Sequence, residues 1–401
     1  MPWHVKWTDR LVERPRVLVD ATSLPPTRGG VARYLAGLLV GLSEIEAPVL
    51  VVVKPEDLAW LSGQAPRHDY VTSPPWLTSR PLRLVWEQWG LPRLARRHGV
   101  DVIHSPHYTF ALAAARRTVV TVHDGTFFSA PEDHGRVKGL FFRTWIALGR
   151  RLAARSIAPS DATSRELAQY ARAAHGPVDV AHHGVDPVVF RPPSDESVRA
   201  FAARLGLDPR VGWIAFLGTV EPRKNVGPLI AAHEAMTQRD ATTPPLLVAG
   251  GLGWDVEASR RLEEAGDVVG GTLRYLGYLP LDDLSPFLGG ASLVVYPSSA
   301  EGFGLPVLEA MSTGALVLTT DRTALPEVGG DAVIYAEPVE GSLTTAMTEA
   351  LTDRDGGAAL RGRAVGRAKL FTWAACAVVH HAAYRAVSDG AASGENGRER
   401  E

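Results

Sequence analysis

The sequence contains a single cysteine, Cys376, so no disulfide can form within the chain. It has no apolar run near the ~18 residues that a membrane-spanning helix needs, and residues 1–4 lack the apolar core of a signal peptide. An excess of one charge is also missing, because 42 basic and 44 acidic side chains give a net charge of -2. Proteins that bind nucleic acid usually carry a basic excess, so this class is disfavoured. These absences predict a cytoplasmic protein that contacts a membrane, if at all, only at its surface.

Short apolar runs alternate with longer helical patterns along most of the chain. The runs are continuously apolar, which is typical of parallel strands covered on both faces. The alternation breaks near Asp186-Pro187 and Pro192-Pro193, which predicts two α/β domains, 1–186 and 187–370. Residues 388–401 are polar and glycine-bearing, so we expect a disordered tail there. The predicted strands are residues 17–20, 49–53, 100–103, 118–122 and 156–158 in the first domain, and 213–217, 246–249, 273–276, 293–296 and 315–318 in the second.

The most informative segment directly follows the predicted strand 293–296. It carries two glutamates, Glu301 and Glu309, separated by glycines and by Pro306, which suits the first turn of a helix. Exposed amides at such a helix start attract phosphate, and a carboxylate can hold vicinal hydroxyls of a sugar or ribose. The alternative is a solvated loop acid followed by a residue that complements the helix dipole. The residues between the glutamates, Gly302, Phe303, Gly304 and Leu305, favour the binding site.

An adjacent basic pair, Arg223 and Lys224, follows the predicted strand 213–217 and Gly218. Arginine offers a planar fork and lysine a compact charge, so together they can neutralise a leaving diphosphate. A solvated basic pair is the ordinary alternative. The position of Arg223 and Lys224 directly after a predicted strand favours the functional interpretation, because ligands of parallel sheets bind at the carboxyl ends of the strands.

Two further strand exits carry candidate residues. Gly29 and Gly30 allow close backbone approach to a ligand, although a simple tight turn would look the same. His123 and His104 end predicted strands and can bind a substrate hydroxyl, although a structural histidine is the default for each alone. His182-His183 and His380-His381 look like surface or interface pairs. No metal site is predicted, because HExxH and CxxC are absent and Asp353-Arg354-Asp355 lies far from any strand exit.

Together these features resemble the retaining GT-B glycosyltransferases of family four. The strongest marker is the E-x7-E pattern, matched by Glu301 and Glu309. Supporting matches are residues 221–225, Gly29-Gly30, His123-Asp124 and residues 183–186. Residues 86–89 and 103–106 resemble the branch of the family that builds bacterial polysaccharides and glycolipids and includes mannosyltransferases.

The resemblance implies two Rossmann-like domains that face a central cleft. Residues 187–370 would bind the nucleotide sugar and residues 1–186 the acceptor, while a last helix, 371–387, would return to the N-terminal domain with Trp373. Glu309 would hold the ribose, and Glu301 with the amides of residues 302–305 would hold the hexose. The diphosphate would lie between Arg223-Lys224 with Gly218 and Gly29-Gly30, and His123 would contact the hexose near its reacting carbon.

The implied reaction is retaining hexosyl transfer without a metal or another cofactor. GDP-mannose is the favoured donor, with UDP-hexoses next, and the acceptor is a saccharide, glycolipid or small molecule. A GT-B sugar-nucleotide epimerase and a non-catalytic nucleotide-binding module are the alternatives.

Charge is divided unevenly along the chain. Residues 1–186 carry 23 basic and 17 acidic side chains, against 19 and 27 in the remainder. The basic half, with Leu91, Leu94 and Ala95 as an amphipathic face, could contact an anionic membrane; solvated helix faces are the alternative. The contributing arginines are Arg93, Arg96, Arg97, Arg116, Arg117, Arg150, Arg151 and Arg155.

Overall fold

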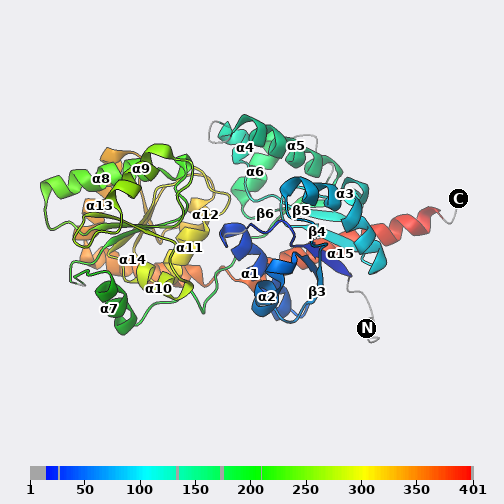
Figure 1. Ribbon diagram of the computed structural model, residues 1–401, viewed down its shortest axis with the longest axis horizontal. Helices are drawn as coiled ribbons and strands as arrows, with labels where there is room; N and C mark the ends of the chain where they lie inside the picture. Colours follow the sequence, from blue (N-terminus) through cyan, green and yellow to red (C-terminus); the bar gives the residue numbers. More distant parts are fainter. Residues whose placement is uncertain (1–14, 26–27, 132–134, 172–175, 209, 399–401) are drawn as a thin grey trace.

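A computed structural model describes residues 15–25, 28–131, 135–171, 176–208 and 210–398. Residues 1–4 and the last three residues of the chain lie outside this part. Figure 1 shows two α/β lobes side by side, each built around its own sheet. All paired strands in both sheets run parallel, which confirms the predicted pair of Rossmann-like domains.

The first lobe contains a seven-stranded sheet in the order β3-β2-β1-β4-β5-β6-β7. Its central strands are buried along their whole length, as the continuous apolar runs predicted. The strands are β1 (Val17–Asp20), β2 (Leu50–Val53), β3 (Asp69–Thr72), β4 (Val102–Ser105), β5 (Thr118–Thr121), β6 (Arg155–Ala158) and β7 (Val178–Val180). The helices are α1 (Gly30–Glu44), α2 (Pro55–Gln64), α3 (Arg80–Arg97), the 3₁₀ helix η1 (Leu112–Arg117), α4 (Thr126–Ser129), α5 (Arg136–Leu152) and α6 (Asp161–Tyr170).

The second lobe contains a six-stranded sheet in the order β10-β9-β8-β11-β12-β13. Its strands are β8 (Ile214–Leu217), β9 (Leu246–Ala249), β10 (Leu273–Gly277), β11 (Leu293–Tyr296), β12 (Val317–Thr319) and β13 (Ile334–Tyr335). Its helices are α7 (Asp195–Arg204), the 3₁₀ helix η3 (Pro222–Lys224), α8 (Val226–Arg239), α9 (Val256–Ala265), α10 (Leu281–Gly289), α11 (Leu305–Ser312), α12 (Leu325–Gly329), α13 (Glu340–Thr352) and α14 (Arg354–Ala368).

The strand order reverses direction once in each sheet. In the first sheet the reversal lies between β1 and β4, and in the second it lies between β8 and β11. The loops that leave such neighbouring strands diverge and open a crevice at their carboxyl ends. The predicted glycine, basic and glutamate segments follow β1, β8 and β11, so the topology brings them to these two crevices.

The last helix, α15 (Trp373–Arg398), belongs to the first lobe although it follows the second in sequence. Trp373, Cys376 and Tyr384 are buried in the same apolar cluster as α1. Trp373 lies so close to α1 that a Cβ at Gly37 would approach its ring to 2.0 Å. The helix is continuous to Arg398, and it contains no proline that would end it.

Helix α3 does not present the apolar face that we predicted for a membrane. Leu91 and Ala95 are buried against the sheet, because they follow the inward stripe of the helix. The exposed apolar residues of α3 are Leu82, Val85 and Trp89 instead. Among the described residues, no helix has the length and apolar character to cross a bilayer.

Candidate functional site

The loop between β11 and α11 places Glu301 at the edge of the interlobe cleft. Gly304 adopts a left-handed conformation (φ 104°) as the residue before α11, and Pro306 lies in the first turn of that helix. The loop can therefore turn sharply from the strand into the helix. This geometry explains the glycine and proline that the sequence places between the two glutamates.

The Glu301 carboxylate is held by residues of its own lobe. Its Oε1 accepts hydrogen bonds from the Tyr296 hydroxyl at 2.8 Å and the Ser298 hydroxyl at 3.0 Å, and lies 2.6 Å from Arg223 Nη1. The backbone N–H of Glu301 donates to Thr323 Oγ1 at 2.9 Å. These contacts fix the carboxylate before any ligand binds, and the sequence analysis had singled out neither Tyr296 nor Thr323.

Arg223 and Lys224 are adjacent in the chain but have different partners. Arg223 forms ion pairs with Glu301 and with Glu221, whose Oε2 lies 2.8 Å from Arg223 Nε. Burial alone would lower the pKa of Arg223, but the two carboxylates raise it above its usual value. Arg223 is therefore a fixed cation that holds Glu301 in place.

Lys224 is the less committed cation of the pair. It is buried, and burial lowers the pKa of its ammonium group. Within the described part of the chain it forms no ion pair. A Cβ at Gly218 would lie 3.1 Å from Lys224 Nζ, so this glycine leaves the room that the ammonium group occupies. A buried, unpaired ammonium group is suited to an anionic ligand.

Glu309 lies on α11 and is only 2% exposed. Burial raises the pKa of its carboxyl, and Arg33 opposes this effect. Both carboxylate oxygens lie within hydrogen-bond distance of Arg33 Nη1, at 2.7 Å for Oε1 and 2.6 Å for Oε2. Arg33 belongs to α1 of the first lobe, so this ion pair spans the cleft. The sequence analysis missed Arg33, although its position in the first turn after Gly29-Gly30 marked it as a neighbour of the site.

Gly29 and Gly30 face open space. Among the described residues outside the immediate chain and helix neighbours, no atom lies within 4 Å of the place that a Cβ would take at either residue, and neither has a positive φ. Packing and backbone strain therefore do not require glycine here. What two missing side chains provide is room beside the start of α1, where a ligand can approach the backbone amides.

The two lobes touch at Gly302. Its carbonyl oxygen accepts hydrogen bonds at 2.6 Å from the hydroxyl of Ser160, the N-cap residue of α6, and at 3.1 Å from the Thr163 hydroxyl in that helix. The side chain of Phe303 is buried beside His183 rather than open to the cleft. Within the predicted segment 302–305, the side chain of Phe303 thus packs at the lobe interface, whereas Leu305 is only partly buried.

His123 lies at this interface, close to the glutamate loop. Its Nε2 lies 2.8 Å from the Pro106 carbonyl oxygen, and burial lowers its pKa, so the neutral ring donates this bond. The Tyr34 ring packs edge-on against it at 4.9 Å. The rings of Tyr108 and His183 also lie near it, at 6.0 and 6.1 Å between ring centres.

The other histidines have structural roles. His104 is buried in β4 between Thr121 and Tyr384, each within 2.9 Å of a ring nitrogen, so the structural default holds. His380 is fully buried against Tyr34, which corrects the expected surface pair at 380–381. His183 is buried between the lobes, and neither of its ring nitrogens has a hydrogen-bond partner.

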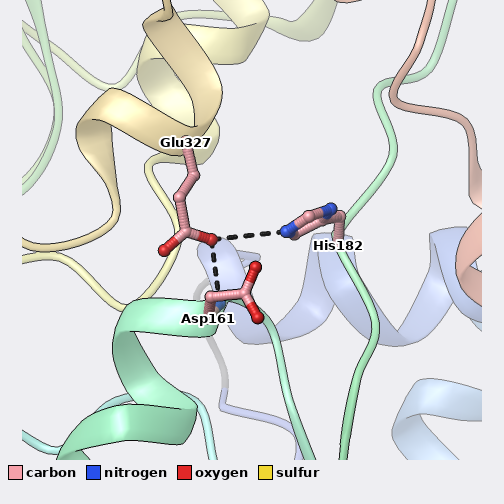
Figure 2. Close-up of side chains that lie close together, drawn as sticks. All are labelled: Asp161, His182 and Glu327. Carbon is pink, nitrogen blue, oxygen red and sulfur yellow. Dashed lines mark hydrogen bonds and ion pairs between the residues drawn. The ribbon is translucent and has the colours of Figure 1, made fainter.

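One group of side chains has the spacing of a metal site. Ligand atoms of Asp161, His182 and Glu327 lie within 4.8 Å of one another. Figure 2 shows that the Glu327 carboxylate faces the start of α6, where it accepts the N–H of Asp161 at 2.8 Å and that of Ala162 at 2.6 Å. His182 Nε2 lies 3.3 Å from the same carboxylate. Because both carboxylate oxygens already accept amides, the group caps α6 across the lobe interface.

A cavity of about 340 Å³ lies between the lobes beside Arg223. The first lobe contributes Ser129, Ala130 and Glu166 to its wall. The remaining cavity wall comes from the second lobe: Pro222, Asn225, Ser299, Ala300 and Thr323.

A separate polar cluster lies at the carboxyl ends of β1 and β4, where Arg83 pairs with Asp20 at 3.7 Å and with Glu87 at 3.2 Å.

Comparison with known proteins identifies relatives along most of the chain. Residues 28–189 match the family described as Glycosyltransferase Family 4, and residues 212–353 match Glycosyl transferases group 1. The chain is 30% identical over 293 residues to O-antigen chain mannosyltransferase B of Escherichia coli, covering 71% of this chain and 74% of that protein. It is 30% identical over 343 residues to a D-inositol 3-phosphate glycosyltransferase of Segniliparus rotundus, covering 82% and 68%.

Solved structures share the fold. The chain is similar to Anabaena HepE in complex with UDP and glucose, with a TM-score of 0.68, 18% identity, and coverage of 90% of this chain and 97% of that one.

Proposed function

The chain belongs to glycosyltransferase family 4 and is a glycosyltransferase, and we propose that it moves a hexose from a nucleotide sugar to an acceptor hydroxyl with retention of configuration. The observation that carries this proposal is the group of Arg223, Glu301 and Lys224, which the loops after β8 and β11 bring together. It combines a fixed carboxylate for sugar hydroxyls with an unpaired cation for phosphate.

The leaving group determines the chemistry. Cleavage of the sugar–phosphate bond builds negative charge on the diphosphate, and cations already in place stabilise that charge without reorganisation. Lys224 supplies the uncommitted charge, while the amides at the start of α1 and α11 supply oriented donors. We therefore propose that turnover needs no metal ion and no other cofactor.

The donor sugar and the acceptor can be proposed more specifically. The E. coli relative is a mannosyltransferase, which favours a mannosyl donor, GDP-mannose in our proposal. The structural relative was solved with UDP and glucose, so UDP-hexoses are the second choice. The acceptor lies in the first lobe, near the polar cluster of Asp20, Arg83 and Glu87. It is a saccharide, a glycolipid or a small molecule that carries a free hydroxyl.

The test is turnover with a panel of GDP-, UDP-, ADP- and dTDP-sugars in the presence of EDTA. We expect hexosyl transfer or slow sugar release with one nucleotide class, and an α-configured donor should give an α-linked product by proton NMR. Lys224→Ala should lower turnover strongly, whereas Lys369→Ala, which changes an exposed lysine of the same lobe, should not. An inverted linkage, or activity that is lost in EDTA and restored by magnesium, contradicts the proposal.

A further inference from the structure

Arg33 binds the Glu309 carboxylate, which the proposed function assigns to binding the ribose. Its Nη1 lies within 2.7 Å of both oxygens of Glu309. Glu309 is buried, and its only described ion pair is with Arg33. A ribose that binds Glu309 through two hydroxyls would bond to those same two oxygens, each of which already accepts a hydrogen bond from Arg33. Arg33 therefore lies where the donor's ribose is proposed to bind.

Arg33 lies one helical turn after Gly29 and near Lys224. The Arg33 backbone N–H donates to Gly29 O at 3.0 Å, so the side chain starts beside the open space at Gly29-Gly30. The guanidinium carbon lies 5.6 Å from the centre of the Phe190 ring. Arg33 is also close enough to Lys224 for its charge to contribute to the lowered pKa of that ammonium group. Its neighbourhood is thus the place where the diphosphate is proposed to bind.

We propose that Arg33 exchanges Glu309 for the donor's diphosphate when a nucleotide sugar binds. In the free protein, Arg33 neutralises a buried carboxylate that would otherwise be uncompensated. In the complex, the ribose hydroxyls take over Glu309, and the guanidinium group binds phosphate oxygens opposite Lys224. This inference rests on the proposed function and adds to it a donor-binding residue from the first lobe.

The exchange predicts how the protein discriminates between ligands. A nucleoside has a ribose but no phosphate, so it displaces Arg33 and offers no new partner. A nucleoside diphosphate displaces Arg33 and binds it again. Arg33 should therefore weaken nucleoside binding and strengthen nucleoside diphosphate binding, whereas a residue that only supports the fold would change both affinities in the same proportion.

The experiment measures the ratio of the nucleoside Kd to the nucleoside diphosphate Kd, with uridine against UDP and guanosine against GDP, by calorimetry. One charge-assisted hydrogen bond corresponds to roughly a ten- to hundred-fold change in affinity. We expect Arg33→Ala to lower the ratio at least tenfold for the nucleotide that the wild-type protein binds. Arg116→Ala, which removes an exposed arginine of the same lobe, should leave the ratio unchanged.

Two further variants control for misfolding and for the loss of charge. Arg33→Gln keeps a hydrogen-bonding side chain without charge and should lower the ratio like alanine, and it replaces Arg33→Ala if that variant does not fold. Arg33→Lys keeps the charge and should retain most of the ratio. An unchanged ratio in Arg33→Ala or Arg33→Gln overturns the exchange. Failure of the wild-type protein to bind any nucleoside diphosphate would instead contradict the proposed function.

Discussion

Gly302 of the second lobe lies against His123 of the first lobe so closely that a Cβ at position 302 would be 1.8 Å from the His123 carbonyl oxygen. The two lobes therefore meet backbone to backbone, at the loop that carries Glu301. Only glycine permits this approach, and hydrogen bonds from α6 to the Gly302 carbonyl hold it.

A methyl group at this contact should separate the lobes. We expect Gly302→Ala to lower transfer by about 100-fold, because a shift of about 1 Å in a catalytic site has an effect of that size. Small-angle scattering should show a larger radius of gyration. Gly227→Ala in α8 is the matched control, because a Cβ there meets no atom within 4 Å. Its activity and its scattering should match those of the wild-type protein. Unchanged scattering and activity in Gly302→Ala would show that the contact is not needed.

The two glutamates of the family pattern should fail in different ways. Glu309→Ala removes the proposed ribose ligand, so nucleotide affinity should fall by about 1.5–3 kcal/mol, or roughly ten- to a hundred-fold. Glu301→Ala should leave nucleotide affinity nearer to the wild-type value but impair transfer and sugar selection, because Glu301 is held beside Arg223 for the hexose. Calorimetric titration with the nucleotide and rate measurements with two donor sugars separate these effects. Normal nucleotide affinity in Glu309→Ala contradicts the assignment.

The pH dependence of the protein's stability should show the titration of the buried Glu87 carboxyl. This carboxyl is fully buried, and its Oε1 has no hydrogen-bond partner. Burial raises its pKa to about 7, Arg83 opposes the increase and Asp20 adds to it. A carboxyl whose pKa is higher in the folded state stabilises the fold at low pH, and this contribution is lost as pH rises from about 4.5 to about 7.

Glu87→Gln should remove that pH dependence. Between pH 5 and pH 8, its free energy of unfolding should improve relative to the wild-type protein by up to about 3 kcal/mol. Chemical unfolding at both pH values measures the difference. Glu44→Gln changes an exposed glutamate at the end of α1 and should follow the wild-type profile. A constant difference between Glu87→Gln and the wild-type protein would show that Glu87 is already charged at pH 5.

We predict that membrane contact uses the outer face of α3. Val85 and Trp89 are 57% and 66% exposed, and the exposed Arg93, Arg96 and Arg97 follow on the same helix. An apolar face beside basic residues is suited to an anionic membrane surface, where each basic residue contributes about 1 kcal/mol. The double variant Val85→Ser, Trp89→Ser should sediment less with anionic vesicles at low salt.

The control for this prediction changes two exposed valines of the second lobe, Val268 and Val269, to serine. It should sediment like the wild-type protein. If the wild-type protein ignores both anionic and neutral vesicles at low salt, the membrane proposal is wrong and a soluble acceptor is favoured.

The sequence predicted the interior of each sheet well because those strands are buried on both faces and consist of continuous apolar residues. It missed β3, β7 and β13, which are only partly buried or short. Asp69 and Asp179 interrupt the apolar pattern of β3 and β7, which lie at opposite edges of the first sheet. The apolar pattern alone therefore does not find β3 and β7, although it finds β10 at the edge of the second sheet.

The site was predictable where it lies in one loop and not where it spans the cleft. Glu301, Arg223 and Lys224 follow strand ends in the sequence, so local pattern and family resemblance pointed to them. The Arg33–Glu309 pair joins residues 276 positions apart and depends on how the lobes are packed. The buried place of Leu91 and Ala95 likewise depends on which side of α3 meets the sheet.

Because α15 packs into the first lobe, that lobe can be completed only after the second lobe has been synthesised. Trp373 packs against Gly37, Gly41 and Gly184, so the first lobe contains a groove that only the end of the chain fills. While the ribosome is still making the second lobe, that groove is open and the apolar surface of α1 is exposed to water. The second lobe, in contrast, has all of its sheet before α15 emerges. The half that begins first is therefore completed last, and a fragment that ends at the linker would lack part of its core.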